Sequence, residues 1–304
     1  MNGDKDSKGL QEPGALTAAF NGTGPEATAT LLRLARSLIP VVREAGEIEL
    51  KYYHDGETAM EKEDGSPVTL ADQKAEKLIS AYLAKLAPGI PIVGEESTAA
   101  GVVPDISKGI YFLVDPLDGT KEFIKHNGDF TVNIALMIDN RPVMGIIYAP
   151  LSGKIYLAGG DEAYSVAEDG TETKLGVRPL PDAGLTVLEG KRPGDAEKTA
   201  ALLEGRKIET TLDRSSSLKF CAIAAGEADI YPRLGGTSEW DTAAGEAILR
   251  AAGGKIVTLS GAPLTYGKTD DKFHNPDFIA FGAAEAWPGA EKMPAAVKQP
   301  GKAR

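Results

Sequence analysis

Two aspartates lie three residues apart in the hexapeptide Asp-Pro-Leu-Asp-Gly-Thr at positions 115–120, directly after an apolar run at 110–114. The apolar run predicts a buried strand. Pro116 and Gly119 are typical of a tight turn, so we expect Asp115 and Asp118 to leave the end of that strand together. Ligands bind at the strand ends of open α/β sheets, and a few carboxylates plus substrate phosphate commonly hold Mg²⁺. The alternative is a solvated, Asp-capped β-turn, which this motif alone does not exclude.

Other acidic residues are placed so that they could complete the same site. Glu95 follows a predicted strand that ends at Val93, and Asp241 opens a predicted helix. The alternative for Glu95 is a solvated loop residue, and for Asp241 it is a helix cap, a position that Asp favours. Four carboxylates that converge repel one another unless a cation lies between them. If these residues meet in the fold, we therefore expect a metal site.

Asp72 lies three residues after Thr69, at the start of a predicted helix. This spacing resembles a capping box, in which the two side chains bond to each other's backbone N–H groups. The competing interpretation makes Asp72 a general base, or a group that orients an attacking water. The sequence leaves both interpretations open.

Mixed secondary structure must position these groups. Helical spacing predicts helices over residues 28–53, with a kink at Pro40, and over 69–86. The predicted strands are 90–93, 110–114, 130–138, 143–148, 154–158, 185–188, 229–232, 255–259 and 278–280, and the later helices are 195–204, 216–226 and 241–252. A hairpin is expected at 139–142. This order predicts an α+β half over 26–158 and an α/β half over 159–286, with a cleft between them.

The whole chain has the composition of a globular protein, with 304 residues, 42% hydrophobic and 25% charged. Its net charge of −11 argues against general nucleic-acid binding, which needs a basic surface. Cys221 is the only cysteine, so no disulfide can form within the chain, and a reducing cytoplasm is the expected compartment. We expect neither a signal peptide nor a membrane span. The polar segments at 1–25 and 287–304 predict disordered tails.

Three motifs together resemble the signature of the inositol monophosphatase superfamily. They are Gly-Glu-Glu at 94–96, the hexapeptide at 115–120, and Trp-Asp-Thr-Ala-Ala-Gly at 240–245, in the order found in that superfamily. The resemblance spans roughly residues 28–285. It implies a mixed α+β and α/β fold, a layered αβαβα sandwich with a metal site between its two halves.

The resemblance also implies two or three Mg²⁺ ions and a role for each motif residue. The implied metal ligands are the side chains of Glu95, Asp115, Asp118 and Asp241 and the carbonyl oxygen of Leu117. Asp72 and Thr120 would position and deprotonate the attacking water. The backbone amides of Gly119 and Thr120 would hold the phosphate, and Asp241 would also contact the substrate.

The second half resembles the bacterial 3'(2'),5'-bisphosphate nucleotidase subfamily, in Ser-Ser-Ser-Leu-Lys-Phe-Cys at 215–221 and Ala-Asp-Ile-Tyr-Pro-Arg at 228–233. Inositol monophosphatases usually carry an acid in place of Arg233 and no cation in place of Lys219. A second phosphate needs cations, so Lys219 and Arg233 are candidates to bind it, and the resemblance implies Ser217 as a further substrate contact. The alternatives are a helix lysine that reaches solvent and an arginine in a surface ion pair.

We therefore expect a Mg²⁺-dependent phosphatase that removes the 3'-phosphate of adenosine 3',5'-bisphosphate, and of 3'-phosphoadenylyl sulfate, in sulfur assimilation. The closest alternative is an inositol monophosphatase or a broad sugar-phosphate phosphatase. An alternative of another class is a non-catalytic nucleotide or metal sensor, which would not need the water-activating pair Asp72 and Thr120. The sequence leaves the oligomeric state open, a homodimer included, and it does not exclude a peripheral position on the inner face of the plasma membrane.

Overall fold

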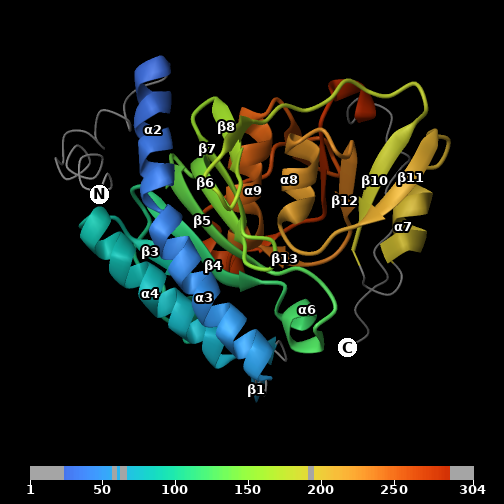
Figure 1. Ribbon diagram of the computed structural model, residues 1–304. Coiled ribbons are helices and arrows are strands. Elements are labelled where there is room, and N and C mark those ends of the chain that lie inside the picture. Colours follow the sequence, from blue (N-terminus) through green and yellow to red (C-terminus); the bar gives the residue numbers. More distant parts are fainter. Residues whose placement is uncertain (1–23, 57–59, 62–66, 191–194, 288–304) are drawn as a thin grey trace.

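The computed structural model describes residues 24–56, 60–61, 67–190 and 195–287, in which helices and sheets alternate in layers (Figure 1). This layering is the αβαβα sandwich expected from the sequence, so the predicted fold class is confirmed. The predicted disordered tails lie outside the described residues apart from their inner ends. At these ends, a helix already begins at Pro25, and Trp287 is the last residue described.

The first layer covers one face of the larger sheet with three helices. They are α2 (Pro25–Ser37), α3 (Ile39–Asp55) and α4 (Leu70–Leu86). The prediction of one kinked helix over 28–53 is wrong, because α2 and α3 are separate helices on either side of Leu38. Pro40, in the first turn of α3, has no N–H with which to continue the helical ladder. The apolar faces of these helices pack on the sheet in one buried cluster.

The larger sheet has seven strands among the described residues. In spatial order these are β3 (Ile92–Gly94), β4 (Tyr111–Asp118), β5 (Thr131–Ile138), β6 (Arg141–Ala149), β7 (Lys154–Gly159), β8 (Glu162–Val166) and β9 (Glu172–Lys174). The predicted hairpin between β5 and β6 is confirmed, and Asp139 and Asn140 have φ of 51° and 54°, as a type I′ turn requires. Because β8 and β9 continue the sheet, it extends past residue 158, where the first half was predicted to end.

The smaller sheet combines parallel and antiparallel strands. Its order is β11 (Ile208–Asp213), β10 (Leu185–Glu189), β12 (Ile230–Arg233), β16 (Phe278–Phe281) and β14 (Lys255–Thr258). The edge strand β11 escaped prediction because it is largely exposed and lacks an apolar alternation. Helix α7 (Asp195–Leu202) is next to β10 and, through Leu202, packs against the apolar cluster on one face of this sheet.

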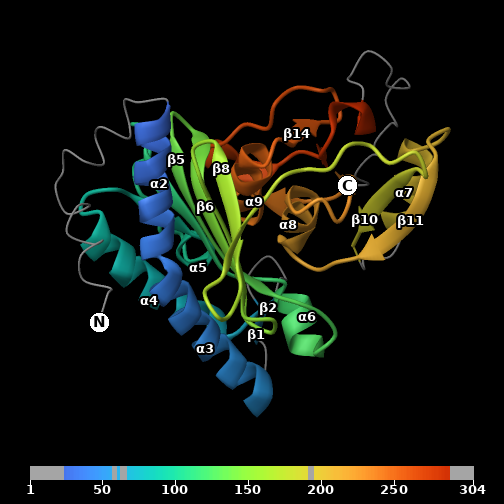
Figure 2. The same cartoon turned by 45° about the horizontal axis from the view of Figure 1, so that its top comes forward.

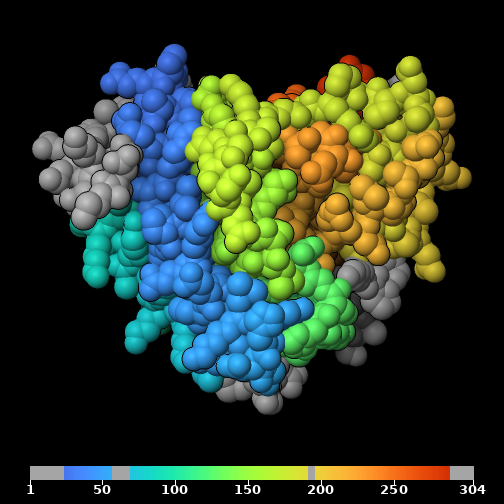
Figure 3. Space-filling view, in the orientation of Figure 1, coloured from blue at the N-terminus to red at the C-terminus, as the bar shows by residue number. Residues whose placement is uncertain are grey.

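Two helices fill the space between the sheets, α8 (Leu218–Ala224) and α9 (Glu239–Ala251) (Figure 2). Helix α9 contacts β4 to β8 on one side and β14 on the other, so it joins the two halves. A Cβ at Gly245 would lie 2.3 Å from Cδ2 of Phe220 in α8, so only glycine allows the two helices to approach this closely. In Figure 3 the blue helices α2 and α3 form one flank of the molecule, and the yellow and orange C-terminal elements form the opposite flank.

Shorter elements complete the described fold. They are β1 (Met60–Glu61), β2 (Pro67–Val68), α5 (Glu95–Ala99), α6 (Thr120–Lys125), β13 (Thr237–Ser238), η1 (Thr269–Asp271), β15 (His274–Asn275) and η2 (Ala284–Ala286). No described helix has both the length and the apolar character needed to cross a membrane.

Candidate active site

The hexapeptide at 115–120 lies at the end of β4, but its local structure differs from the prediction. Both aspartates belong to the strand, which is irregular between them, because Asp115 pairs with Asn133 of β5 and Asp118 with Thr131. The backbone N–H of Leu117 donates to Oδ1 of Asp115 at 3.1 Å, which fixes this carboxylate against its own strand. Gly119, with φ of 100°, then turns the chain into α6.

Four acidic side chains from three elements meet at this strand end. Burial raises the pKa of Asp115 well above its usual range, and the charges of Glu95, Asp118 and Asp241 raise it further. Burial likewise raises the pKa of Asp241 to about 7, again with contributions from Asp118 and Glu95. The proximity of the Asp241 side chain therefore favours the uncharged form of Asp115 as long as no cation lies between them.

Asp241 is the third residue of α9 rather than its cap. Ser238 caps this helix, and its backbone N–H donates to Oδ2 of Asp241 at 2.9 Å. Asp241 therefore takes part in capping α9, as the helix-cap alternative expected, but it does so as the third residue of the helix and through only one carboxylate oxygen. From the first turn of α9, the charge of Asp241 acts on Asp115 of β4.

Asp72 takes part in both of the interactions that the sequence left open. Its Oδ2 accepts hydrogen bonds from the backbone N–H of Thr69 at 2.8 Å and from the Thr69 hydroxyl at 2.6 Å, so the capping box is present. Its Oδ1 lies 3.4 Å from the hydroxyl of Thr120, which is also 3.1 Å from the carbonyl oxygen of Leu117. A hydroxyl has one proton, so Thr120 can donate to only one of these acceptors at a time.

The predicted phosphate-binding residues occupy different environments. Gly119 is the cap of α6, and Thr120 is its first residue. The amides of a helix's first turn have no partner within the helix. Arg233 lies at the end of β12, where it donates to the carbonyl oxygen of Gly236 at 3.3 Å, and its charge acts to lower the pKa of Asp241.

Lys219 is more enclosed than a residue that reaches solvent. It is 4% exposed, its Nζ lies 3.3 Å from the carbonyl oxygen of Ser216, and it sits over the ring of Tyr231 at 5.1 Å. The interpretation of Lys219 as a helix lysine that reaches solvent is therefore wrong. Its contact with Ser216 also ties it to the loop that leads into α8.

The donor set suits a hard divalent cation. All the predicted ligands offer oxygen, as Mg²⁺ prefers, and the like charges that raise the pKa of Asp115 mark a place where positive charge is favourable. In the described part of the chain, no three or more Asp, Glu, His or Cys side chains are already arranged around one ligand position. Internal hydrogen bonds hold one oxygen each of Asp115, Asp118 and Asp241.

Glu49 is a buried carboxyl group that the sequence analysis did not single out. It is fully buried in α3, neither of its carboxylate oxygens has a hydrogen-bond partner, and burial followed by the charge of Asp72 raises its pKa well above the usual range. A signal was present, because Val42, Ala45 and Glu49 follow the spacing of a buried helix face. Burial therefore favours the uncharged form of Glu49, and the charge of Asp72 favours it further.

Replacing Glu49 with methionine should stabilise the protein at pH 8 by about 1–3 kcal/mol, the cost of burying a polar group without a partner. The folded state holds the Glu49 proton more tightly than the unfolded state, so wild-type stability falls as pH rises above the unfolded pKa. The gain should therefore shrink at pH 4, as measured by denaturant unfolding at both values. Glu47→Met, an exposed position on the same helix, is the control. A gain that is equal at both pH values would contradict an uncharged Glu49.

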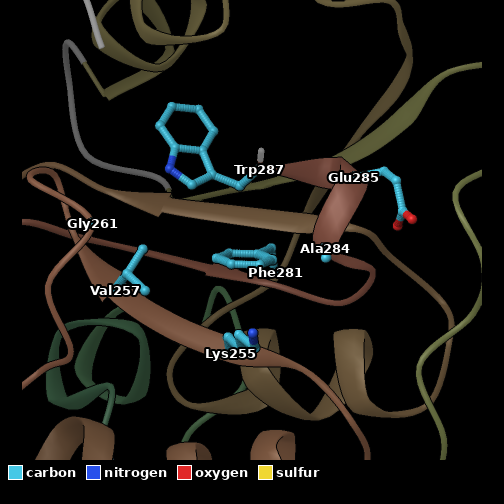
Figure 4. Close-up of a pocket in the computed structure, with 7 residues that line it drawn as sticks. All are labelled: Lys255, Val257, Gly261, Phe281, Ala284, Glu285 and Trp287. Atoms are coloured by element: carbon cyan, nitrogen blue, oxygen red, sulfur yellow. The ribbon is translucent and has the colours of Figure 1, made fainter. Parts of the chain in front are cut away.

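A separate cleft of about 510 Å³ lies at the smaller sheet (Figure 4). Its lining residues are Lys255, Val257, Gly261, Phe281, Ala284, Glu285 and Trp287. Figure 4 shows the carboxylate of Glu285 turned away from the rings of Phe281 and Trp287. None of the predicted site residues lines this cleft, so the carboxylate cluster at the end of β4 is the better candidate for the active site.

Comparison with known proteins shows which proteins the chain is similar to. The Inositol monophosphatase family matches residues 30–285 of the chain. The chain is 42% identical over 241 residues to the 3'(2'),5'-bisphosphate nucleotidase CysQ of Salmonella typhimurium, covering 78% of this chain and 95% of the relative. It is 39% identical over 251 residues to the CysQ of Buchnera aphidicola, covering 82% and 93%.

Solved structures with the same fold include close and distant relatives. CysQ from Bacteroides thetaiotaomicron, a bacterial member of the inositol monophosphatase family, has a TM-score of 0.68 at 36% identity, covering 82% of this chain and 96% of that chain. The extragenic suppressor protein SuhB from Bartonella henselae has a TM-score of 0.65 at 24% identity, covering 82% and 93%. At 24% identity, the similarity to SuhB concerns the fold alone.

Proposed function

The chain belongs to the inositol monophosphatase family, and on this premise we propose that it is a 3'(2'),5'-bisphosphate nucleotidase that removes the 3'-phosphate of adenosine 3',5'-bisphosphate and of 3'-phosphoadenylyl sulfate. The observation that carries the proposal is the cluster of Glu95, Asp118 and Asp241 around the buried Asp115, whose mutual repulsion calls for cations. Relatives named as this nucleotidase, which are 39–42% identical over most of the chain, favour the nucleotide substrate.

Metal dependence is general in this family, and we propose that Mg²⁺ is the cation here. Glu95, Asp115, Asp118, Asp241 and the Leu117 carbonyl oxygen would hold two or three ions. When bound, Mg²⁺ would supply positive charge to the phosphate oxygens and to the oxygen that leaves. The burial of Asp115 supports this assignment, because a buried carboxylate without a counter-charge is expensive.

The proposed roles of the remaining residues follow from their contacts. Thr69 engages Oδ2 of Asp72 and leaves its Oδ1 facing the Thr120 hydroxyl, so that this oxygen can accept a proton from a water held there. The Leu117 carbonyl oxygen, 3.1 Å from the same hydroxyl, helps to orient Thr120. The amides of Gly119 and Thr120 would bind phosphate oxygens at the start of α6.

The substrate can be tested directly by comparing hydrolysis of adenosine 3',5'-bisphosphate and inositol 1-phosphate by the wild-type enzyme with Mg²⁺. We expect a clear preference for the bisphosphate in kcat/KM. A preference for inositol 1-phosphate would favour the inositol monophosphatase alternative. Hydrolysis of neither substrate would favour a sensor, although a sensor gives no reason for the contact between Asp72 and Thr120.

Arg233 is the residue that we propose reads the second phosphate. Arg233→Glu should lower kcat/KM for adenosine 3',5'-bisphosphate by ~10- to 1000-fold, because a charge-assisted hydrogen bond is worth about 1.5–3 kcal/mol and the new charge repels phosphate. Activity on inositol 1-phosphate should fall much less. Arg141→Glu, an exposed arginine at the β5–β6 hairpin, is the matched control. Equal losses on both substrates would indicate damage to the shared site and would contradict this role.

The proposal also covers the compartment, the class of partner and the assembly of the protein. The buried, single Cys221 is consistent with a reducing cytoplasm, which remains a prediction. The acidic net charge of −11 favours a small-molecule partner over nucleic acid. We propose a homodimer only as one assembly to test, by the molar mass of the purified protein in solution.

A further inference from the structure

Ser217 lies where three structural elements meet at the carboxylate cluster. Its hydroxyl oxygen is 2.8 Å from Oδ2 of Asp118 on β4, 2.9 Å from the backbone carbonyl oxygen of Asp241 on α9, and 2.9 Å from Nδ2 of Asn133 on β5. Ser217 itself directly precedes α8 and is 1% exposed. One buried side chain therefore links a ligand from the first half of the chain to the backbone of a ligand from the second.

The hydrogen bonds of Ser217 hold Asp118 in one orientation. Its backbone N–H donates to Oδ2 of Asp118 at 2.7 Å, in addition to the contact with the hydroxyl. Asn133 approaches the same oxygen at 3.4 Å. Every hydrogen bond that the described residues donate to the carboxylate of Asp118 thus goes to Oδ2. Its Oδ1 can therefore bind another ligand.

The hydroxyl of Ser217 has no proton left to donate to a substrate phosphate. It accepts a hydrogen bond from Asn133, and its single proton goes either to Asp118 or to the carbonyl oxygen of Asp241. When the proton goes to the carbonyl oxygen of Asp241, the backbone N–H of Ser217 still holds Asp118, so Ser217 joins Asp118 to α9 in that arrangement. The near-complete burial of Ser217 also argues against the substrate contact that the sequence resemblance implied.

We propose that Ser217 is a positioning residue that joins Asp118 to the first turn of α9 and so fixes the spacing of the metal ligands, rather than a residue that binds the substrate. The inference rests on the proposed function for the identity of the cation. Groups that orient metal ligands typically contribute a factor of about 10–100 to metal affinity. Loss of the Ser217 hydroxyl should therefore weaken Mg²⁺ binding and leave the substrate contacts in place.

The test is calorimetric titration of Mg²⁺ into metal-free wild-type protein and Ser217→Ala, without nucleotide. We expect the Mg²⁺ dissociation constant to rise about 10-fold or more in Ser217→Ala. KM for adenosine 3',5'-bisphosphate at saturating Mg²⁺ should change less than about twofold. Ser215→Ala, a neighbouring buried serine that no described hydrogen bond links to the cluster, should bind Mg²⁺ like the wild type.

Two further variants keep the test decisive if Ser217→Ala does not fold. Ser217→Thr keeps the hydroxyl and should retain wild-type affinity for Mg²⁺. Asn133→Ala removes the donor to that hydroxyl and should weaken Mg²⁺ binding in the same direction, but less. An unchanged Mg²⁺ affinity in Ser217→Ala, or in Asn133→Ala if the former is unfolded, together with a raised KM, would overturn the proposal in favour of a substrate contact.

The outcome is independent of the substrate assignment, because the binding titration contains no nucleotide. If Ser217→Ala binds Mg²⁺ more weakly than the wild type and neither protein hydrolyses adenosine 3',5'-bisphosphate, the positioning role stands and the proposed function fails. If the wild type hydrolyses the bisphosphate and the two Mg²⁺ affinities agree, the proposed function stands and the positioning role fails.

Discussion

Replacing Asp115 with asparagine should abolish turnover while leaving the fold intact. Asp115 lies at the centre of the carboxylate cluster, and its charge interacts with Glu95, Asp118 and Asp241. The loss of this negative charge should weaken Mg²⁺ binding. The metal-free protein should become more stable at neutral pH, because the variant removes a buried carboxyl group whose pKa is raised by burial and by like charges.

Two measurements check this prediction. The first is kcat with Mg²⁺, and the second is the thermal midpoint with and without Mg²⁺. The ion should raise the midpoint of the wild type, because it binds the folded state, but should raise that of Asp115→Asn much less. Asp105→Asn, an exposed aspartate whose neighbour Ser107 donates to it, is the control. A variant that retains more than about a tenth of the wild-type rate, a loss of only ~1.4 kcal/mol, would contradict a central metal-binding role.

Asp72→Asn should lower kcat by roughly two to four orders of magnitude, the usual contribution of a general base. KM should barely change, because Asp72 is 1% exposed and is proposed to contact water rather than the nucleotide. Stability should also change little, since an asparagine oxygen can still accept the hydrogen bond from the Thr69 backbone N–H. The measurements are kcat, KM and the denaturation midpoint.

Thr69→Ala is the matched control for the structural role of Asp72. This change removes the hydroxyl that accepts from the backbone N–H groups of Ala71 and Asp72, and it should cost about 1–2 kcal/mol of stability. Its effect on kcat should be far smaller than that of Asp72→Asn. If Asp72→Asn loses stability to the same extent and keeps its kcat, Asp72 is a helix cap and not a base.

The sequence predicted the sandwich, and it predicted the helices and strands with apolar runs or helical spacing. The sequence did not predict elements in which the apolar pattern is weak. β8, β9 and β11 are short or exposed strands, and their residues form ladders with neighbours that are visible only in the fold. The break between α2 and α3 was expected only as a kink. Pro40 removes one backbone N–H donor, but this loss does not determine how far the helix axis turns.

The sequence by itself determined which residue types could form the site. The acids in three motifs lie at strand ends or helix starts, and these positions follow from local patterns. Asp72 also shows why a local pattern can leave two functions open. Its spacing from Thr69 indicates a cap, whereas its contact with Thr120, 48 residues later in the chain, exists only in the folded protein.

Only the tertiary structure decided what Ser217, Lys219 and Glu49 do. Their residue types suggest polar contacts with a ligand or solvent, yet the packing of α3, α8 and α9 buries all three. Burial removes water as a partner, so each group must bond to the protein or stay uncharged. Ser217 bonds to Asp118 and Asn133, Lys219 contacts the Ser216 carbonyl oxygen, and burial raises the pKa of Glu49. These outcomes depend on contacts between residues far apart in the chain, which no local pattern specifies.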